Sequence, residues 1–377
     1  MSLRFIPVVI TFIIINLYVG WHGNWLLSFY DVPLAGTLYW ILFWVVALSY
    51  LIGRFRLVPG PLGRGLKVVG SYYIAVLEFA VILLPITDLV AWFLHLAGIA
   101  STSYVPFLSG IVGIVLIALL LRGSWNAWST VKRTYELEVP KIAGGLKELR
   151  ILVASDIHLG NIVGKRHLRR LILHMRAMQP DLILLPGDVI DDDIEPFMRN
   201  NMAKVMKQLH ARLGVYAVLG NHEYYGGHIE QYVKEMKKIG IQVLRDETVL
   251  VDNLFYVVGR KDKAAEGMDP EGRAGIEALL APLDHSKPII VMDHQPYHFD
   301  KAAHAGADLL LSGHTHRGQF APNHWITRRL FELDWGYMQK GMMHVIVSSG
   351  FGSWGPPIRL ASRSEVIEIV LHFHEKK

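Results

Sequence analysis

Residues 151–160 read ILVASDIHLG, an apolar run that stops abruptly at two polar residues, Asp156 and His158. The run has the length and composition of a strand that is buried on both faces. While a chain stays extended, residues i and i+2 point the same way. We therefore expect the end of this strand to offer an oxygen and an imidazole to the same ion.

Four later apolar runs end in the same way. They lead into Gly187-Asp188, Gly220-Asn221-His222-Glu223, Asp293-His294 and Gly313-His314-Thr315-His316. Ligands of open α/β sheets gather beyond the carboxyl ends of the strands, so these side chains are expected to converge. The glycines that precede Asp188, Asn221 and His314 are expected to bring the backbone close to this site.

The segments between these runs indicate the fold class. Residues 165–178 and 196–213 are amphipathic and predict helices, whereas the stretch around Asp252-Asn253 predicts a hairpin. The pattern favours an α/β domain whose sheet is partly antiparallel.

The N-terminal third has a different composition. Residues 1–121 contain five basic and three acidic residues, out of totals of 38 and 33. Four apolar runs lie at about 5–21, 36–52, 71–96 and 104–121, and each reaches the roughly 17 to 25 residues that span a bilayer. We predict a transmembrane domain of about four helices at 1–122, an interfacial linker at 123–133 and the α/β domain at 134–377.

Positive charges predict the orientation of the four spans. The flanking residues are Arg4 before the first run, Arg54, Arg56, Arg64 and Lys67 between the second and third, and Arg122, Lys132 and Arg133 after the fourth. All fall on one side, which the positive-inside tendency makes the cytoplasm. The prediction is a multi-pass protein of the cell membrane with a cytoplasmic catalytic domain.

Two acidic residues, Glu78 and Asp88, lie inside the third run. An ionisable side chain within a span is costly unless it is paired, protonated or facing water. Two interpretations stay open: the pair lines a groove that contacts lipid or an ion, or one or both lie near enough to the interface to be hydrated.

The convergent side chains indicate metal chemistry. The candidate ligands are Asp156, His158, Asp188, Asn221, His294, His314 and His316. They supply oxygen and imidazole ligands but no sulfur, and the chain has no cysteine. Seven ligands are too many for one tetrahedral ion and suit two divalent ions, which Asp188 can bridge. Two such ions clamp the attacking and leaving oxygens of a phosphoester hydrolysis and acidify a bound water.

These motifs resemble those of a known family. SDIHLG, PGDVIDDD, LGNHEYY, MDHQP and SGHTHRGQ are similar, in order, to the motifs of the calcineurin-like metallophosphoesterase superfamily. The resemblance covers about residues 135–373, and the tail FGSWGPPIRL resembles the membrane-associated bacterial branch. It implies a metallo-dependent phosphatase fold, an αβ-βα sandwich of mixed sheets.

The resemblance also implies roles for single residues. Asp156, His158, Asp188 and His316 would hold one ion, and Asp188, Asn221, His294 and His314 would hold the other, with Mn, Fe or Zn as the metal. His222 would be catalytic, stabilising the phosphate or protonating the leaving oxygen. Arg317 is a candidate to bind a substrate phosphate, although a surface arginine is the simpler interpretation. The run Asp191-Asp192-Asp193 has two interpretations: an extension of the metal site, or a solvated turn and helix start, which is favoured.

Three functions remain open. The favoured one is a membrane-bound phosphoesterase that uses a dinuclear metal-bridged hydroxide, with lipid phosphates among its candidate substrates and membrane lipids as partners. The second is a nucleotide phosphodiesterase or nuclease anchored to the membrane. A net charge of only +3 for residues 122–377 argues against nucleic acid as a partner. The third is a sensor or transporter with a regulatory domain. No protein partner is indicated.

Overall fold

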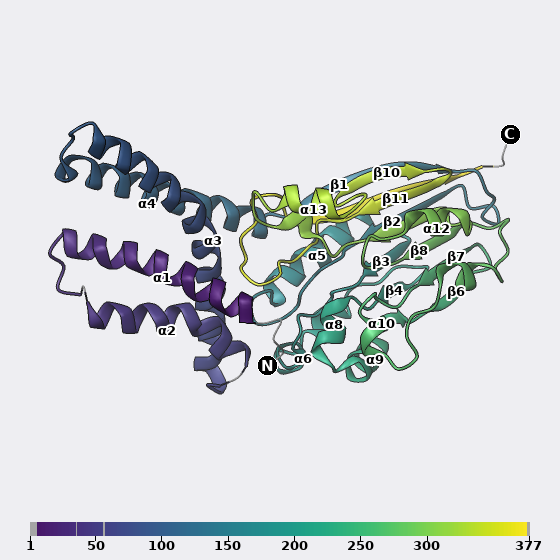
Figure 1. Cartoon of the computed structure of the whole chain (residues 1–377). Helices are drawn as coiled ribbons and strands as arrows, with labels where there is room; N and C mark the ends of the chain where they lie inside the picture. Colours follow the sequence, from purple (N-terminus) through teal and green to yellow (C-terminus); the bar gives the residue numbers. More distant parts are fainter. Residues whose placement is uncertain (1–5, 35, 56, 375–377) are drawn as a thin grey trace. The chain divides into compact units, whose positions relative to one another are not determined.

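The computed structural model describes residues 6–34, 36–55 and 57–374. The chain divides into two compact units, Met1–Gly123 and Ser124–Lys377 (Figure 1). Of the residues expected to link the two parts, 123–128 end the helix Ser101–Trp128, 129–130 connect, and 131–133 begin the strand Val131–Val139.

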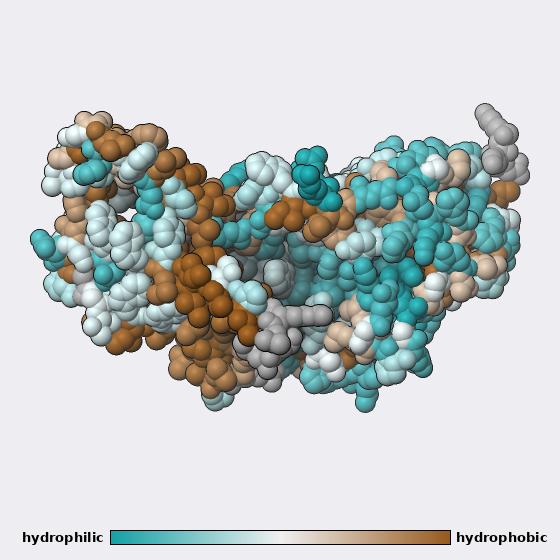
Figure 2. All heavy atoms as spheres, viewed as in Figure 1, coloured by the Kyte–Doolittle hydropathy of each residue, from teal (hydrophilic) through white to brown (hydrophobic). Residues whose placement is uncertain are grey.

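The N-terminal unit consists of long apolar helices. They are α1 (Ile6–Phe29), α2 (Thr37–Arg54), α3 (Gly60–Leu96) and α4 (Ser101–Trp128). All four are long and apolar enough to cross a membrane, as the sequence predicted. The brown surface of these helices in Figure 2 is the hydrophobic exterior that a bilayer would cover.

Small residues let α2 and α3 approach closely. A Cβ atom on Gly53 would lie 2.5 Å from the carbonyl oxygen of Gly63, and one on Gly70 would collide with the backbone of Tyr50. Membrane helices associate through such contacts because lipid tails provide no hydrophobic driving force between helices. The two glycines therefore fix the packing of this helix pair.

Asp88 is paired within the N-terminal unit. Its carboxylate lies 2.8 Å from His22 Nε2 and accepts a 2.5 Å hydrogen bond from the Tyr18 hydroxyl. Both partners come from α1, so the pair joins α1 to α3. The cost of an acidic group in a span is thereby reduced.

The C-terminal unit contains two six-stranded mixed sheets. The first has the order β1 (Val131–Val139), β12 (Glu365–Phe373), β2 (Glu148–Val153), β3 (Leu182–Pro186), β4 (Val215–Val218) and β5 (Gln242–Leu244). The second has the order β10 (Gly336–Lys340), β11 (Met343–Val347), β9 (Leu309–Ser312), β8 (Ile289–Met292), β7 (Phe255–Gly259) and β6 (Glu247–Val251). The expected hairpin at Asp252-Asn253 joins β6 to β7 in antiparallel register.

Shorter helices connect the strands of the C-terminal unit. They are α5 (Lys165–Met178), α6 (Ile194–Arg199), α7 (Ala203–Met206), α8 (Asn221–Gly226), α9 (Ile229–Lys238), α10 (Ala265–Met268), α11 (Ile276–Leu280), α12 (Phe299–His304), α13 (His324–Leu330) and the 3₁₀ turn η2 (His316–Gly318). The single helix expected at 196–213 is wrong. Asn201 has a positive φ of 49°, which separates α6 from α7.

Three apolar clusters hold these layers together. One lies between the sheets and includes Ile151 and Ile290, a second packs α5 on the first sheet, and a third packs α11 and α12 on the second sheet. The domain is therefore the expected αβ-βα sandwich.

Strands β2, β3 and β4 are parallel, as are β7, β8 and β9, so their carboxyl ends meet at common edges.

Candidate metal centre

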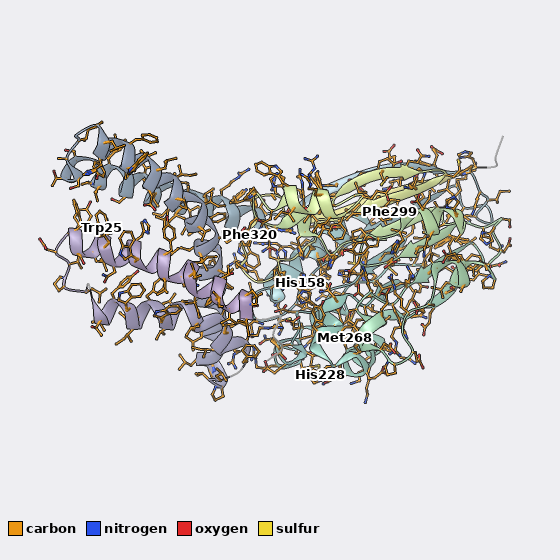
Figure 3. The ribbon with its side chains drawn as sticks, viewed as in Figure 1. Trp25, His158, His228, Met268, Phe299 and Phe320 are labelled. Atoms are coloured by element: carbon orange, nitrogen blue, oxygen red, sulfur yellow. The ribbon has the colours of Figure 1, made fainter. Side chains whose placement is uncertain are left out.

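The seven predicted ligands come together at the carboxyl ends of five strands. Asp156 and His158 follow β2, Asp188 follows β3, Asn221 follows β4, His294 follows β8, and His314 and His316 follow β9. All are buried except His314, which is partly exposed. Figure 3 shows His158 within this unit, away from His228 and Met268 at its edge. The predicted convergence is confirmed.

The backbone presents most of these side chains in an unexpected way. Asp156, His158, Asp188, His314 and His316 have positive φ values of 52°, 51°, 52°, 72° and 47°. Strand β2 has already ended at Val153, so the explanation of Asp156 and His158 as i and i+2 of an extended strand is wrong. Left-handed conformations are costly for most residues, but Asp, Asn and His adopt them more readily than others.

Two glycines allow the close approach that the sequence predicted. A Cβ atom on Gly187 would lie 2.5 Å from His294 Nδ1, and one on Gly220 would collide with the carboxylate of Asp188. Gly187 also has a φ of 87°, which favours glycine. The backbone thus passes directly behind two candidate ligands.

The first group of ligands is Asp156, His158 and His316. His316 Nε2 lies 3.0 Å from His158 Nε2 and 3.5 Å from an oxygen of Asp156, and His158 Nε2 lies 3.9 Å from Asp188. Among the described residues, the Nδ1 atom of His158 has no hydrogen-bond partner. This imidazole is therefore buried with one hydrogen bond missing. The nitrogens and oxygens around it are the ligand types that a divalent cation binds.

The second group is Asp188, His294 and His314, with Asn221 beside them. His294 Nε2 lies 3.0 Å from Asp188 and 3.2 Å from Asn221 Oδ1, and His314 Nδ1 lies 2.8 Å from the same amide oxygen. His294 Nδ1 donates to the carbonyl of Pro186 at 2.7 Å, which leaves Nε2 free to ligate. Asp188 thus lies within reach of both groups.

The electrostatics of the centre favour a cation. Burial lowers the pKa of His158 to about 4 and that of His314 to about 3, so both imidazoles are neutral at pH 7, the form that binds metals. Burial also acts to lower the pKa of His294, but Asp188 and Asp156 raise it well above its ordinary value. Without a metal, the second group therefore takes up a proton instead.

His222 lies next to the first group but faces acidic residues. Its Nδ1 lies 2.6 Å from Asp192 and 3.7 Å from Asp191. Burial acts to lower its pKa, but Asp188, Asp192 and Asp191 together raise it to about 9. The expectation that Asp191-Asp192-Asp193 is only a solvated turn is therefore wrong for Asp192. Asp193 does cap α6, because it accepts from the backbone N–H of Glu195 at 2.9 Å.

The sequence analysis missed the role of Glu223. This buried carboxylate accepts hydrogen bonds from the backbone N–H groups of Gly220, Asp188 and Ile190 at 2.7, 3.1 and 3.0 Å. It thereby joins the loops that follow β3 and β4, and both loops carry candidate ligands. Its bond to the N–H of Gly220, three residues earlier, is the glutamate half of a capping box, and this glutamate at the third helical position was the available signal.

Arg359 was also missed. Its fully buried guanidinium donates to the carbonyl oxygens of Gly350 and Ser349, and one nitrogen lies 3.0 Å from His316 Nδ1. The arginine belongs to the tail FGSWGPPIRL, which therefore places a buried guanidinium beside a candidate ligand.

Arg317 is held against an aromatic ring. Its guanidinium carbon lies 4.1 Å above the Trp335 ring, and burial lowers its pKa. Stacking fixes the side chain beside the second-sheet ligands His314 and His316. Whether it contacts a substrate stays a prediction.

A family model described as calcineurin-like phosphoesterase matches residues 149–318. An uncharacterized metallophosphoesterase of Aquifex aeolicus is 32% identical over 239 residues, 63% of this chain and 90% of that protein. A transmembrane protein with metallophosphoesterase domain from Danio rerio is 31% identical over 269 residues, 68% of this chain and 61% of that protein. A Campylobacter jejuni metallophosphoesterase is 30% identical over 277 residues, 70% of this chain and 69% of that protein.

Proposed function

Since the chain belongs to the calcineurin-like phosphoesterase family, we propose that it is a membrane-bound enzyme that hydrolyses phosphomonoesters or phosphodiesters with two divalent metal ions. The position of Asp188 between the two ligand groups is the observation that supports two ions. Asp188 lies 3.0 Å from His294 in one ligand group and 3.9 Å from His158 in the other. Both distances run to the same oxygen, Oδ2, so a single carboxylate oxygen lies within reach of both groups and can bridge two ions.

The ligand groups define where the ions would be held. Asp156, His158, Asp188 and His316 would hold one, and Asp188, Asn221, His294 and His314 the other. Such a pair lowers the pKa of a bound water and neutralises charge on the phosphoryl oxygens. The protein's own contribution is a rigid, buried ligand frame, since Glu223 ties two of its loops together.

His222 supplies the proton chemistry. Asp192 holds Nδ1 at 2.6 Å, and three neighbouring carboxylates favour the charged imidazole. The remaining nitrogen, Nε2, is then a donor that can bond a phosphoryl oxygen or protonate the leaving oxygen. The role of general acid for His222 is therefore part of the proposal.

The membrane helices favour a substrate at the bilayer. We infer that all four helices span the membrane, with the C-terminal unit in the cytoplasm, because the basic residues flank only that side. Only Ser129 and Thr130 separate α4 from β1. So short a connection keeps the catalytic unit at the membrane surface and favours a lipid-linked phosphoester as substrate.

The experiment uses the full chain in lipid nanodiscs, with Mn²⁺, Fe²⁺ or Zn²⁺ added in turn. Hydrolysis of bis(p-nitrophenyl) phosphate and of p-nitrophenyl phosphate is compared with that by Asp188→Asn. Metal-dependent turnover that the variant loses would support the proposal and separate diesterase from monoesterase. A folded, metal-loaded chain that cleaves neither ester nor any phospholipid would overturn it.

A further inference from the structure

Helix α13 has an apolar face that the C-terminal unit leaves uncovered. All seven of its residues are described, and none is buried. Trp325, Ile326 and Leu330 are 66%, 58% and 66% exposed. Figure 2 shows brown hydrophobic atoms at the place of α13, next to teal hydrophilic ones. Three large apolar side chains on two turns of one surface helix indicate a binding surface.

The charges of α13 indicate what covers this face. The helix carries Arg328 and Arg329 and no acidic residue. Within the described chain neither arginine forms an ion pair, although Glu332 follows two residues after the helix. A short helix that exposes Trp, Ile and Leu beside two arginines combines the apolar and basic side chains with which helices lie in an anionic membrane surface.

The structure attaches α13 firmly to the metal centre. The Thr327 hydroxyl donates to Asp334 Oδ2 at 2.6 Å, and the carbonyl oxygen of Asp334 accepts a 2.5 Å hydrogen bond from Thr315. Thr315 lies between the candidate ligands His314 and His316. Phe331, the first residue after α13, has its ring centroid 6.1 Å from that of His314. Whatever α13 binds is therefore brought next to the catalytic site.

The end of α4 keeps the C-terminal unit close to the bilayer. Residues 124–128 of this helix belong to the C-terminal unit. Within it, the Asn126 amide donates to the carbonyl of Arg359 at 2.9 Å, and Trp128 packs edge-on against His167 with ring centroids 5.2 Å apart. The last apolar helix thus ends inside the catalytic fold, which cannot diffuse away from the membrane.

We propose that α13 docks into the interfacial layer of an anionic bilayer and so brings the metal centre to phosphoesters that lie in the membrane. Trp325, Ile326 and Leu330 enter the boundary between headgroups and acyl chains. Arg328 and Arg329 bind lipid phosphates. The docking itself stands on the exposed face and its charges, and only the choice of a lipid substrate rests on the proposed function.

The first experiment measures docking without any turnover. The chain has no cysteine, so Ile326→Cys introduces a unique site for an environment-sensitive fluorophore. The labelled full chain is placed in nanodiscs of phosphatidylcholine with phosphatidylglycerol, with or without a lipid-borne quencher. The matched control is Leu173→Cys on α5, which is 62% exposed and outside the proposed surface. We expect a blue shift and lipid quenching at position 326 but not at 173.

Two further measurements decide whether anionic lipid or protein causes such a signal. Arg328→Gln with Arg329→Gln should reduce quenching in anionic nanodiscs and change little in pure phosphatidylcholine, because only the charge attraction is lost. Equal fluorescence and equal lack of quenching at positions 326 and 173 would overturn the proposal. A blue shift at 326 without lipid quenching would also overturn it, because protein and not lipid would then cover the helix.

The second experiment connects docking to substrate choice. Trp325→Ser with Leu330→Ser should lower hydrolysis of phospholipid phosphoesters in nanodiscs by about tenfold or more, since most of the inserted apolar surface is removed. Hydrolysis of water-soluble p-nitrophenyl esters should stay unchanged. An equal loss on both substrates would contradict the inference. If no ester were hydrolysed at all, only the proposed phosphoesterase function would be contradicted. Docking of α13 would still be tested by lipid quenching at position 326, which needs no turnover.

Discussion

His158 and His316 face each other with their Nε2 atoms 3.0 Å apart, although 158 positions separate them in the sequence. Both rings are buried, and their centroids lie 5.0 Å apart. Two facing imidazole nitrogens can share only one proton, so at least one of them presents a lone pair to the other. One N–H···N hydrogen bond satisfies this contact in the metal-free protein, and a cation held by both lone pairs would replace the shared proton, so the pair indicates the first metal position beside Asp156.

Replacing His158 should remove that metal position. We expect His158→Asn to lose about half of the bound metal, measured by mass spectrometry of the purified full chain, and to lower turnover by at least 10²-fold. His210→Ala is the control, because His210 is an exposed histidine of the same unit. Unchanged metal content in His158→Asn would show that this histidine is not a ligand.

Replacing His222 should separate catalysis from metal binding. The side chain faces Asp192 and is no member of the two ligand groups proposed here, so His222→Ala should keep its metal content. Its kcat should fall by about 10² to 10⁴, the usual contribution of a general acid. Asp192→Asn should cause a smaller loss, since His222 remains but is no longer held by a charge. A variant that loses metal and activity together would assign His222 a structural or ligating role.

Glu223 should contribute mainly to stability. In Glu223→Gln one oxygen is replaced by an NH₂ group that faces backbone N–H donors, so at least one buried hydrogen bond is lost. We expect the free energy of unfolding to fall by about 2 kcal/mol. Thermal unfolding in the absence and presence of metal measures this loss, and metal should recover part of it. Wild-type stability in the variant would mean that the three hydrogen bonds add little.

His167 should make the fold sensitive to acid. Burial lowers its pKa from 6.5 to about 4. The unfolded chain therefore binds a proton at a pH where the folded chain does not, and stability falls as the pH decreases from about 6.5 to about 4. This residue contributes up to about 1.4 kcal/mol per pH unit in that window.

His167→Gln keeps a side chain that can donate to the carbonyl of Phe351, the partner of His167 Nε2 at 2.8 Å. Denaturant unfolding of the full chain, measured at about pH 7 and about pH 5, should show a smaller decrease for the variant. The same decrease in both proteins would contradict the prediction.

The sequence predicted the parts of the fold that depend on local pattern. Runs of apolar residues located the four long helices, and the strand-end motifs located the seven candidate ligands. The glycines at 187 and 220 were correctly assigned to close approaches of the backbone. These features could be predicted because each is determined by the hydrophobicity or the conformational freedom of residues near in the sequence.

Features that depend on distant partners could not be predicted. Nothing local shows that His22 and Tyr18 bind Asp88, since 66 and 70 positions separate them from it. The pairing of Asp192 with His222 depends on how two loops meet, as does the support of His316 by Arg359. The break at Asn201 was missed because amphipathic periodicity continues through a turn.

The positive φ values at five candidate ligands determine which substitutions can be interpreted. An alanine at Asp156, Asp188 or His316 would remove a donor atom and also force a Cβ-bearing, non-polar residue into a left-handed backbone, at a cost of about 1 to 2 kcal/mol. An alanine variant would therefore lose activity for two reasons at once, a strained backbone and a missing metal ligand, and an activity assay would not separate them. Asparagine tolerates the same backbone and exchanges only the ligand, so it is the informative replacement at these five positions.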